Sequence, residues 1–418
     1  MRTLVTLAIL LVIGFAGSRG IVARATHRLP LMGLFATGVE FLLLGMIAGP
    51  GGLDLITFDV LHSLEPIVYL ALGWIGLLFG VELSVAEMRA VSPRIFRVLF
   101  IDAAVFGLLF AAILWLPTRY AWPGAPVAAR IAGVAMFGVT ASLTSPTIVA
   151  LVARRLPARG PITALLKILA SLNALFPLLI FGAVFMLVHP RFGAAEWSGV
   201  SVVWWVVGNA AALIMGLLMV LFTQERATDD EMLLVITGTV LLGGGLCYFF
   251  HVSALYSAMM MGLVVANASR RREHIFRELH VVEKPVFVAL FVYVGAIIGL
   301  PSLPVLGVAL VYVIVRTALK WIVTGSLVAR TLDTARPCGS QIGLGLCGHG
   351  VMAVAVALDF ALGGTLGALR GPLAVVAIAV LLDDGTGYAL TRGLLIRRGE
   401  VVQRSQGHDG AQFDEAEG

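Results

Sequence analysis

Apolar segments long enough to cross a lipid bilayer recur along almost the whole chain, and they constrain its fold more than any other feature. The 418 residues are 59% hydrophobic and only 13% charged, with a mean hydropathy of +0.99. A helix needs about 20 apolar residues to cross roughly 30 Å of hydrocarbon. Because backbone groups in hydrocarbon need hydrogen-bond partners within the protein, the sequence predicts an all-α polytopic membrane protein.

We expect about thirteen transmembrane helices, separated by short loops. Their predicted ranges are 3–23, 31–49, 64–83, 96–116, 127–155, 161–187, 198–223, 231–250, 253–268, 283–301, 303–330, 341–364 and 371–395. The transmembrane domain is expected to occupy residues 1–400, and residues 401–418 are expected to form a disordered cytoplasmic tail. The lipid bilayer is therefore an obligatory partner of this protein.

The distribution of basic residues predicts the orientation in the membrane. Loops and segment ends on one side carry 22 of the 29 Lys and Arg residues, and the opposite side carries five. Since Lys and Arg are enriched in cytoplasmic loops, we expect the N-terminus outside and the C-terminus inside, in a bacterial inner membrane. The first segment also resembles a signal peptide, but that alternative would place the arginine-rich residues 19–28 outside.

Two of the apolar segments are interrupted by residues that do not favour a continuous helix. In one, the polar residues Thr140, Ser142, Thr144 and Ser145 lead into Pro146. In the other, a glycine-rich stretch ends in Gly348, His349 and Gly350. A membrane helix tolerates such a break where its backbone lines a cavity within the protein.

The two interruptions occupy corresponding places in the chain. The second to sixth and the ninth to thirteenth predicted helices form two sets of five with opposite orientation, and the fourth helix of each set is the interrupted one. This pattern predicts inverted five-helix repeats with two crossed broken helices and a site between them. The expected parts are an extra N-terminal helix (1–29), a first repeat (30–190), connecting helices (191–250) and an inverted second repeat (251–400).

Ionisable residues within the apolar segments are candidates for the ion path, because each is costly to bury in a membrane. Arg316 and Lys320 are four residues apart and share one helix face. The acidic candidates to pair with them are Glu40, Asp102, Asp359, Asp383 and Asp384. Adjacent helical residues point about 100° apart, so we expect at most one of Asp383 and Asp384 to face the ion path directly. The alternative is that these carboxylates only neutralise the two cations.

Several neutral polar residues remain open to two interpretations. Thr144, Ser145 and Asn173 offer oxygen atoms that either coordinate a cation or satisfy the backbone of a broken helix. His349 either hydrogen-bonds freed carbonyl groups or transfers protons. The sequence contains no set of residues with the spacing of a metal site or an enzyme active site, so we expect a non-enzyme without metal or cofactor. The basic residues follow the membrane segments, so we expect no nucleic-acid partner.

Five stretches of the chain resemble the cation:proton antiporter-2 family, which includes Kef-type and sodium/proton exchangers. Their order and spacing over some 390 residues carry the resemblance. The stretches are the opening run from Leu29 to Leu53, LLFGVELSVAEMRAV (77–91), VSALYSAMMMGLVVAN (252–267), VRTALKWIV (315–323) and LGLCGHGVMAVAVA (344–357). The resemblance implies antiport of Na⁺ or K⁺ for protons by alternating access, carried out by a homodimer.

The chain departs from the family at two positions. Family members typically have Thr-Asp-Pro in the first broken helix, where this chain has Thr144, Ser145 and Pro146. They have Asn-Asp or Asp-Asp in the next helix, where this chain has Asn173 and Ala174. The family uses that last aspartate to bind its ions, and alanine cannot carry a proton. Two alternatives therefore stay open: a non-transporting or regulatory membrane protein on the same scaffold, and a transporter of an anionic substrate.

Overall fold

The computed structural model describes residues 40–188, 199–223, 229–250, 252–363 and 366–401. Regular structure in these ranges is helical, apart from one antiparallel bridge between Ala158 and Val401. The first predicted helix, residues 31–39 of the second and the tail beyond Val401 lie outside the described residues. Glu40 begins the first described helix, and its side chain also lies outside the description.

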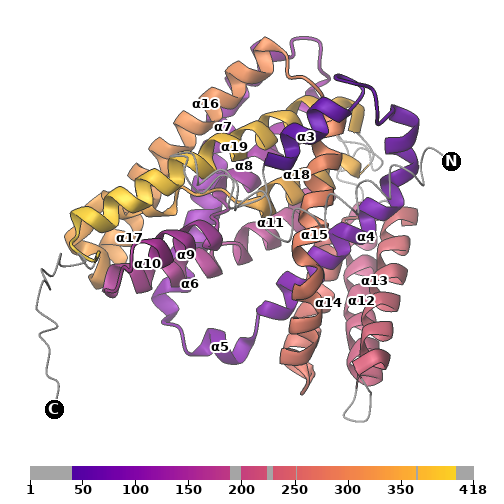
Figure 1. Ribbon diagram of the computed structural model, residues 1–418, viewed down its shortest axis with the longest axis horizontal. Helices are drawn as coiled ribbons and strands as arrows, with labels where there is room; N and C mark the ends of the chain where they lie inside the picture. Colours follow the sequence, from indigo (N-terminus) through magenta and orange to yellow (C-terminus); the bar gives the residue numbers. More distant parts are fainter. Residues whose placement is uncertain (1–39, 189–198, 224–228, 251, 364–365, 402–418) are drawn as a thin grey trace, which may run out of the picture.

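The helices follow one another through the chain with short connections (Figure 1). Their bounds are α3 (Glu40–Ala48), α4 (Phe58–Glu82), α5 (Val85–Arg89), α6 (Pro93–Ile101), η2 (Asp102–Phe106), α7 (Gly107–Ala121), α8 (Val127–Ser142), α9 (Pro146–Arg155), α10 (Pro161–Leu172), α11 (Leu175–Val188), α12 (Gly199–Phe222), α13 (Asp229–Phe250), α14 (Ala254–Ala268), α15 (Arg272–Ile298), α16 (Leu303–Leu319), η4 (Lys320–Thr324), α17 (Gly325–Thr331), η5 (Asp333–Leu346), α18 (Val351–Leu362) and α19 (Leu366–Arg397).

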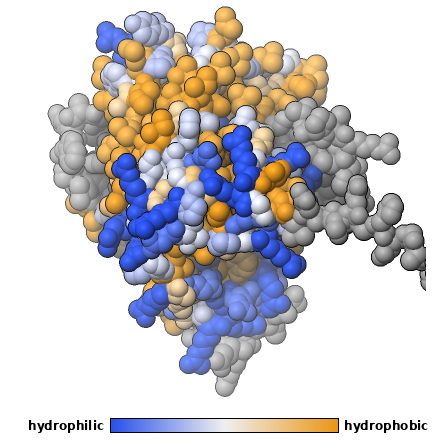
Figure 2. All heavy atoms as spheres, turned by 90° about the vertical axis from the view of Figure 1, so that its left-hand side faces the viewer, coloured by the Kyte–Doolittle hydropathy of each residue, from blue (hydrophilic) through white to orange (hydrophobic). Residues whose placement is uncertain are grey.

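The described helices agree with the predicted membrane segments. Nine helical spans in the described ranges are long and apolar enough to cross a membrane, and η5 with α18 forms a tenth that bends by 52° at its break. The ninth predicted segment is α14, which is apolar but shorter. Figure 2 shows the face that lies to the left in Figure 1, with an apolar region in its upper part and hydrophilic residues gathered across its middle and lower part. An exposed apolar region of this kind is expected for helices that contact lipid.

The helices pack as two groups, which we call the scaffold group and the core group. The scaffold group contains α3, α4 and α12 to α15, where α4 packs on α13 and α14, and α15 packs on α3 (Figure 1). The core group contains α6 to α11 and α16 to α19, including η2, η4 and η5. Each group has a hydrophobic cluster of its own, and a third cluster joins the two groups.

Both predicted broken helices are present, in the core group. The first is interrupted between α8 and α9, where residues 143–145 are not helical, and Pro146 begins α9. The second is interrupted between η5 and α18, where residues 347–350 are not helical. Gly350 there has a φ of +81°, a backbone conformation that glycine adopts without strain. The breaks predicted from the polar, proline and glycine residues are therefore confirmed.

Contacts between loops show which of them lie at the same end of the molecule. Gly51, in the α3–α4 turn, lies next to Gly299 in the α15–α16 turn: a Cβ built on Gly51 would be 3.1 Å from the backbone N of Leu300. The α9–α10 turn instead meets the end of α19, where Arg159 N donates to Glu400 O over 3.0 Å. Loops predicted to share a side of the membrane therefore meet one another.

We predict that these two ends face opposite sides of the membrane, as the basic residues indicate. A cysteine at Leu53, which is 67% exposed, should react with an impermeant maleimide in intact cells. A cysteine at Arg336, whose side chain is 69% exposed, should react only after the membrane is permeabilised. The three native cysteines are buried, so the unmodified protein serves as the unlabelled control. The opposite pattern of labelling would reverse the topology.

Candidate functional site

The two broken helices meet at their breaks. Ser145 N donates to Gly348 O over 2.9 Å, and Thr144 Oγ1 donates to Leu346 O over 3.1 Å. Gly350 allows this approach, because a Cβ at that position would lie 2.7 Å from the Cβ of Ser145. The structure therefore brings together Thr144, Ser145, Gly348 and Gly350, which the sequence placed 200 residues apart. We call this place the crossing.

Arg316 supplies hydrogen-bond donors to the backbone at both breaks. Its Nε donates to Ala141 O over 2.9 Å and its Nη2 to Leu143 O over 2.6 Å, both in the first broken helix. Its Nη1 donates to Cys347 O in the second. The last carbonyl groups of a helix have no partner within it and carry partial negative charge, so a buried guanidinium stabilises them. The fork of donors explains why arginine occupies this position.

The two buried cations pair with different carboxylates. Arg316 Nη1 lies 3.1 Å from Asp383 Oδ2, and Lys320 Nζ lies 3.2 Å from Asp102 Oδ2. Lys320 also donates to Ser142 O over 3.0 Å and lies 4.7 Å from the ring centroid of Phe106. The sequence named both acids as candidate partners. Which acid pairs with which cation is decided by the fold alone.

Both residues of the Lys320–Asp102 pair lie in short π-helical turns. Asp102 begins η2 and Lys320 begins η4, each a turn of five residues. Thr324, at the end of η4, donates to Asp102 Oδ1 over 2.5 Å. π-helical turns within α-helices are rare and are frequent at functional sites. Their coincidence with a fully buried ion pair supports a role for the pair beyond packing.

His349 connects the second break to Asp383 and to Tyr312. Its Nδ1 lies 3.2 Å from Asp383 Oδ2, and its Nε2 lies 2.9 Å from Thr140 O. The Tyr312 hydroxyl lies 3.3 Å from the same Nε2 and 3.1 Å from Thr140 Oγ1. His349 thus contacts a carbonyl group of the first broken helix and an acid, and its two predicted roles both stay predictions.

Both members of the acidic pair on α19 contact the crossing. Asp383 reaches Arg316 and His349, while Asp384 Oδ1 accepts a hydrogen bond of 3.1 Å from Gly350 N at the start of α18. We expected at most one of the two to face the ion path. The fold accommodates both at the crossing because α19 passes directly behind the second break, with Gly387 against Gly348.

The remaining predicted residues lie in different surroundings. Asn173 is buried between α10 and α11, and its Oδ1 has no hydrogen-bond partner in the described structure. Ala174 is buried beside it, at the position where the resemblance places the family's aspartate. Asp359 is also buried, but it points to α14 of the scaffold group and not to the cations.

Sequence reasoning missed the roles of Tyr312 and Thr324. Both roles could have been predicted from the sequence. Polar residues recur there at intervals of four, at Tyr312, Arg316, Lys320 and Thr324. That interval places side chains on one helix face. A polar stripe of four residues along an otherwise apolar segment was therefore visible in the sequence.

Ionisable residues gather at the crossing and next to it. Two cations, Arg316 and Lys320, lie among three carboxylates, Asp102, Asp383 and Asp384, and all five are at most 1% exposed. Buried charged groups within a membrane protein are costly and are candidates for an ion path.

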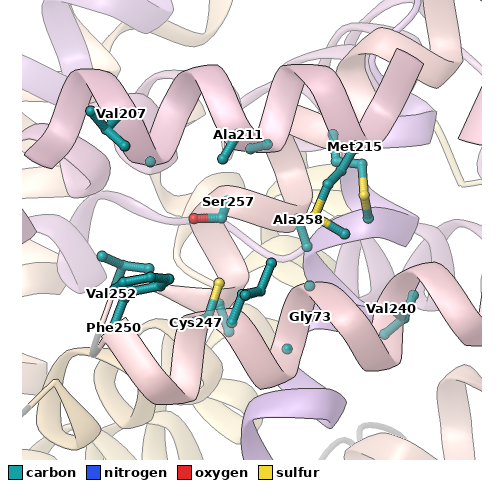
Figure 3. Close-up of a pocket in the computed structure, with 17 residues that line it drawn as sticks. Gly73, Val207, Ala211, Met215, Val240, Cys247, Phe250, Val252, Ser257 and Ala258 are labelled. Atoms are coloured by element: carbon teal, nitrogen blue, oxygen red, sulfur yellow. The ribbon is translucent and has the colours of Figure 1, made fainter. Parts of the chain in front are cut away.

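A cavity elsewhere in the molecule does not offer a second ion site. It has a volume of about 110 Å³ and lies in the scaffold group between α12, α13 and α14 (Figure 3). Its lining is almost wholly apolar, with residues such as Val207, Met215 and Phe250, and the hydroxyl of Ser257 points toward it. A cation in that cavity would find too few oxygen ligands.

Comparison with known proteins identifies the family. The sequence profile described as "Sodium/hydrogen exchanger, transmembrane" matches residues 7–385. This chain belongs to that family. No curated protein matches the exchanger sequence. Among solved structures, it is similar to the sodium proton antiporter MjNhaP1 from Methanocaldococcus jannaschii, with 16% identity and a TM-score of 0.65, over 95% of this chain and 99% of that one. At this identity the likeness establishes the fold.

The pairing of Lys320 with Asp102 can be tested in the exchanger by stability. Asp102→Asn and Lys320→Met should each destabilise the protein by about 3–5 kcal/mol, since each leaves one buried charge unpaired. The double variant should recover most of this loss, as a thermal-unfolding double-mutant cycle would measure. The control is Asp333→Asn, which removes an exposed partner of Arg94 at 3.5 Å and should cost about 1 kcal/mol or less. If the stability losses of the two single variants simply add up in the double variant, Lys320 and Asp102 do not stabilise each other.

Two glycines of α19 provide a second test of the crossing. A Cβ at Gly387 would lie 2.7 Å from the Cα of Gly348, whereas a Cβ at Gly393 meets no heavy atom within 4 Å. Gly387→Ala should therefore destabilise the exchanger by about 1–3 kcal/mol through overpacking. Gly393→Ala should instead stabilise it by up to about 1 kcal/mol, because alanine favours a helix. Equal thermal unfolding temperatures of the two variants would contradict the close approach.

Proposed function

We propose that this exchanger moves a monovalent cation, Na⁺ or K⁺, in one direction and a proton in the other by alternating access. The observation that carries the proposal is the two buried carboxylates at the crossing, Asp383 and Asp384, beside the breaks of both helices. A carboxylate that binds a proton loses the negative charge that would bind a cation. Competition of the two ions for the same carboxylate is the condition for antiport.

The carboxylates that we propose for this role are Asp383 and Asp384. Asp383 uses one oxygen for Arg316 and His349, while its Oδ1 has no hydrogen-bond partner in the described structure. The side chain of Ser145 lies beside Gly350, the residue whose N–H bonds Asp384. Carboxylate and hydroxyl oxygens of this kind are the ligands that hard cations prefer. We propose that this pair replaces the aspartate that Ala174 has removed.

Neutral residues extend the proposed ion path. The side chain of Thr144 lies at the crossing, and its oxygen can still accept while its hydrogen bonds Leu346 O. Asn173 contributes a buried side-chain oxygen without a partner in the described residues. Glu40 stays a candidate by its predicted mid-membrane position. In this proposal Arg316 fixes the backbone of both breaks, and Lys320 with Asp102 sets the local potential.

The arrangement in two groups supports alternating access. The crossing lies within the core group, so movement of that group against the scaffold group would carry the site from one side of the membrane to the other. The outer faces of α12 and α13 are apolar and exposed, at residues such as Val206, Ile214, Leu234 and Phe249. We propose that the scaffold group contacts lipid and forms a homodimer. The N-terminus is proposed to face outward from a bacterial inner membrane.

The two alternatives from the sequence fit the geometry less well. An anionic substrate would need free positive charge, but Arg316 and Lys320 each already contact a carboxylate. A protein that kept only the scaffold has no need for buried carboxylates at the crossing, because replacing a buried ionic network with apolar residues is often stabilising. The geometry therefore favours a cation and a proton as substrates.

Proton flux in vesicles with purified protein tests this function. An imposed Na⁺ or K⁺ gradient should drive proton movement by the wild type. Asp383→Asn or Asp384→Asn should reduce that flux to the level of protein-free vesicles, because an amide neither titrates nor adds negative charge. Asp333→Asn makes the same change at an exposed position and should retain full flux. Flux retained by both Asn variants would place the carrier elsewhere, with Glu40 the next candidate. A wild type that is silent under every cation gradient would support the scaffold-only alternative.

A further inference from the structure

One fully buried carboxylate belongs neither to the crossing nor to either ion pair. Asp359 lies on α18 in the core group and is 1% exposed. It accepts hydrogen bonds from Ser253 Oγ and, over 3.2 Å, from Ala254 N at the start of α14 in the scaffold group. One turn further along α18, Leu362 O accepts a hydrogen bond of 3.2 Å from Tyr69 OH of α4. Asp359 therefore contacts the opposite group through polar bonds.

The partners of Asp359 belong to a rigid part of the scaffold group. A Cβ at Gly76 of α4 would lie 2.1 Å from Leu255 O of α14, and a Cβ at Gly262 of α14 would lie 2.5 Å from Leu77 O of α4. Such direct contact between backbones leaves these two helices little room to move against each other. A bond from Asp359 to α14 consequently fixes α18 relative to both α4 and α14.

Electrostatics strengthens this contact. The first N–H groups of a helix have no partner within it and carry partial positive charge, so a carboxylate placed there is stabilised. Ser253 already caps α14 from within its own chain segment, since its Oγ accepts from Tyr256 N over 3.0 Å. The described ionisable groups that interact with Asp359 from α4 and α13 are Tyr69 and Cys247, and neither is a cation. The described partners of its carboxyl group are therefore hydrogen-bond donors at the end of α14.

We propose that Asp359 is a positioning residue that latches the core group onto the scaffold group in the conformation described here. The proposal rests on the proposed function, since a latch matters only if the core group moves. Moving α18 away from α14 would leave a buried carboxyl group without its hydrogen-bond partners, and an unsatisfied buried polar group is costly. Asp359 thereby sets the balance between this conformation and the other one that alternating access requires.

Two tyrosines provide a matched comparison. Tyr69 OH bonds Leu362 O across the boundary between the groups, whereas Tyr293 OH bonds Leu61 O over 3.3 Å within the scaffold group. Both tyrosines are buried and both donate to a backbone carbonyl. Tyr69→Phe should weaken the latch, while Tyr293→Phe removes an equivalent bond that does not restrain the core group.

Distance measurements between spin labels test the latch without any ion gradient. One label replaces Glu273, exposed on α15 of the scaffold group, and the other replaces Arg336, exposed on η5 of the core group. The native cysteines are buried and should remain unlabelled. In lipid nanodiscs, double electron–electron resonance should give one main distance for the wild-type latch. Asp359→Asn should raise the ratio of a second distance to the first by about tenfold, since an amide replaces one of the two acceptor oxygens with a donor.

The variants separate a latch from a merely structural bond. Tyr69→Phe should shift the ratio in the same direction but less, and Tyr293→Phe should leave it unchanged. An unchanged ratio in both Asp359→Asn and Tyr69→Phe would overturn the proposal, even if thermal stability falls. If Asp359→Asn fails to fold, the two tyrosine variants alone decide, and equal distance ratios in them would overturn it. If the two variants Asp359→Asn and Tyr69→Phe shift the distance ratio but the wild type shows no ion flux, the proposed function is refuted and the latch is supported.

Discussion

The structure depends on how its broken backbone is hydrogen-bonded inside the membrane. Two helices stop at the crossing, and each break frees carbonyl groups that water cannot reach. Arg316 provides donors to Ala141 and Leu143 in one broken helix and to Cys347 in the other. Without a buried guanidinium, these carbonyls would each lose a hydrogen bond in a medium that offers no substitute. One side chain thus holds both breaks together.

A buried cation in turn requires buried anions. Arg316 draws Asp383 to the crossing, and Lys320, one turn further along the same helix face, is matched by Asp102. Asp384, bound to the start of α18, adds a third carboxylate to this buried network. This arrangement differs from the one that the family motif implies, because Ala174 leaves no acid on the helix after the first break. The negative charge comes instead from α19 and from η2.

The same fold combines a rigid part with a boundary that has few polar bonds. Within the scaffold group, glycines bring α4 and α14 into backbone contact. Across the boundary, the described contacts are mainly apolar side chains, which lose little specific geometry when one group slides on the other. The bonds of Asp359 and Tyr69 to opposite groups are directional exceptions. A directional bond restrains a sliding surface far more than apolar packing does.

The sequence by itself determined that the chain is an all-helical membrane protein, where two helices break, and which buried residues carry charge. Hydrophobic length, proline and glycine are local properties, so they are readable without a structure. Only the tertiary structure decided that Lys320 pairs with Asp102 and not with α19, that both Asp383 and Asp384 reach the crossing, and that Asp359 turns to the scaffold group. Asp102 and Lys320 are 218 positions apart, and hydropathy carries no information on which carboxylate a cation meets. That choice depends on how the helices pack and on the π-helical turns that direct these two side chains.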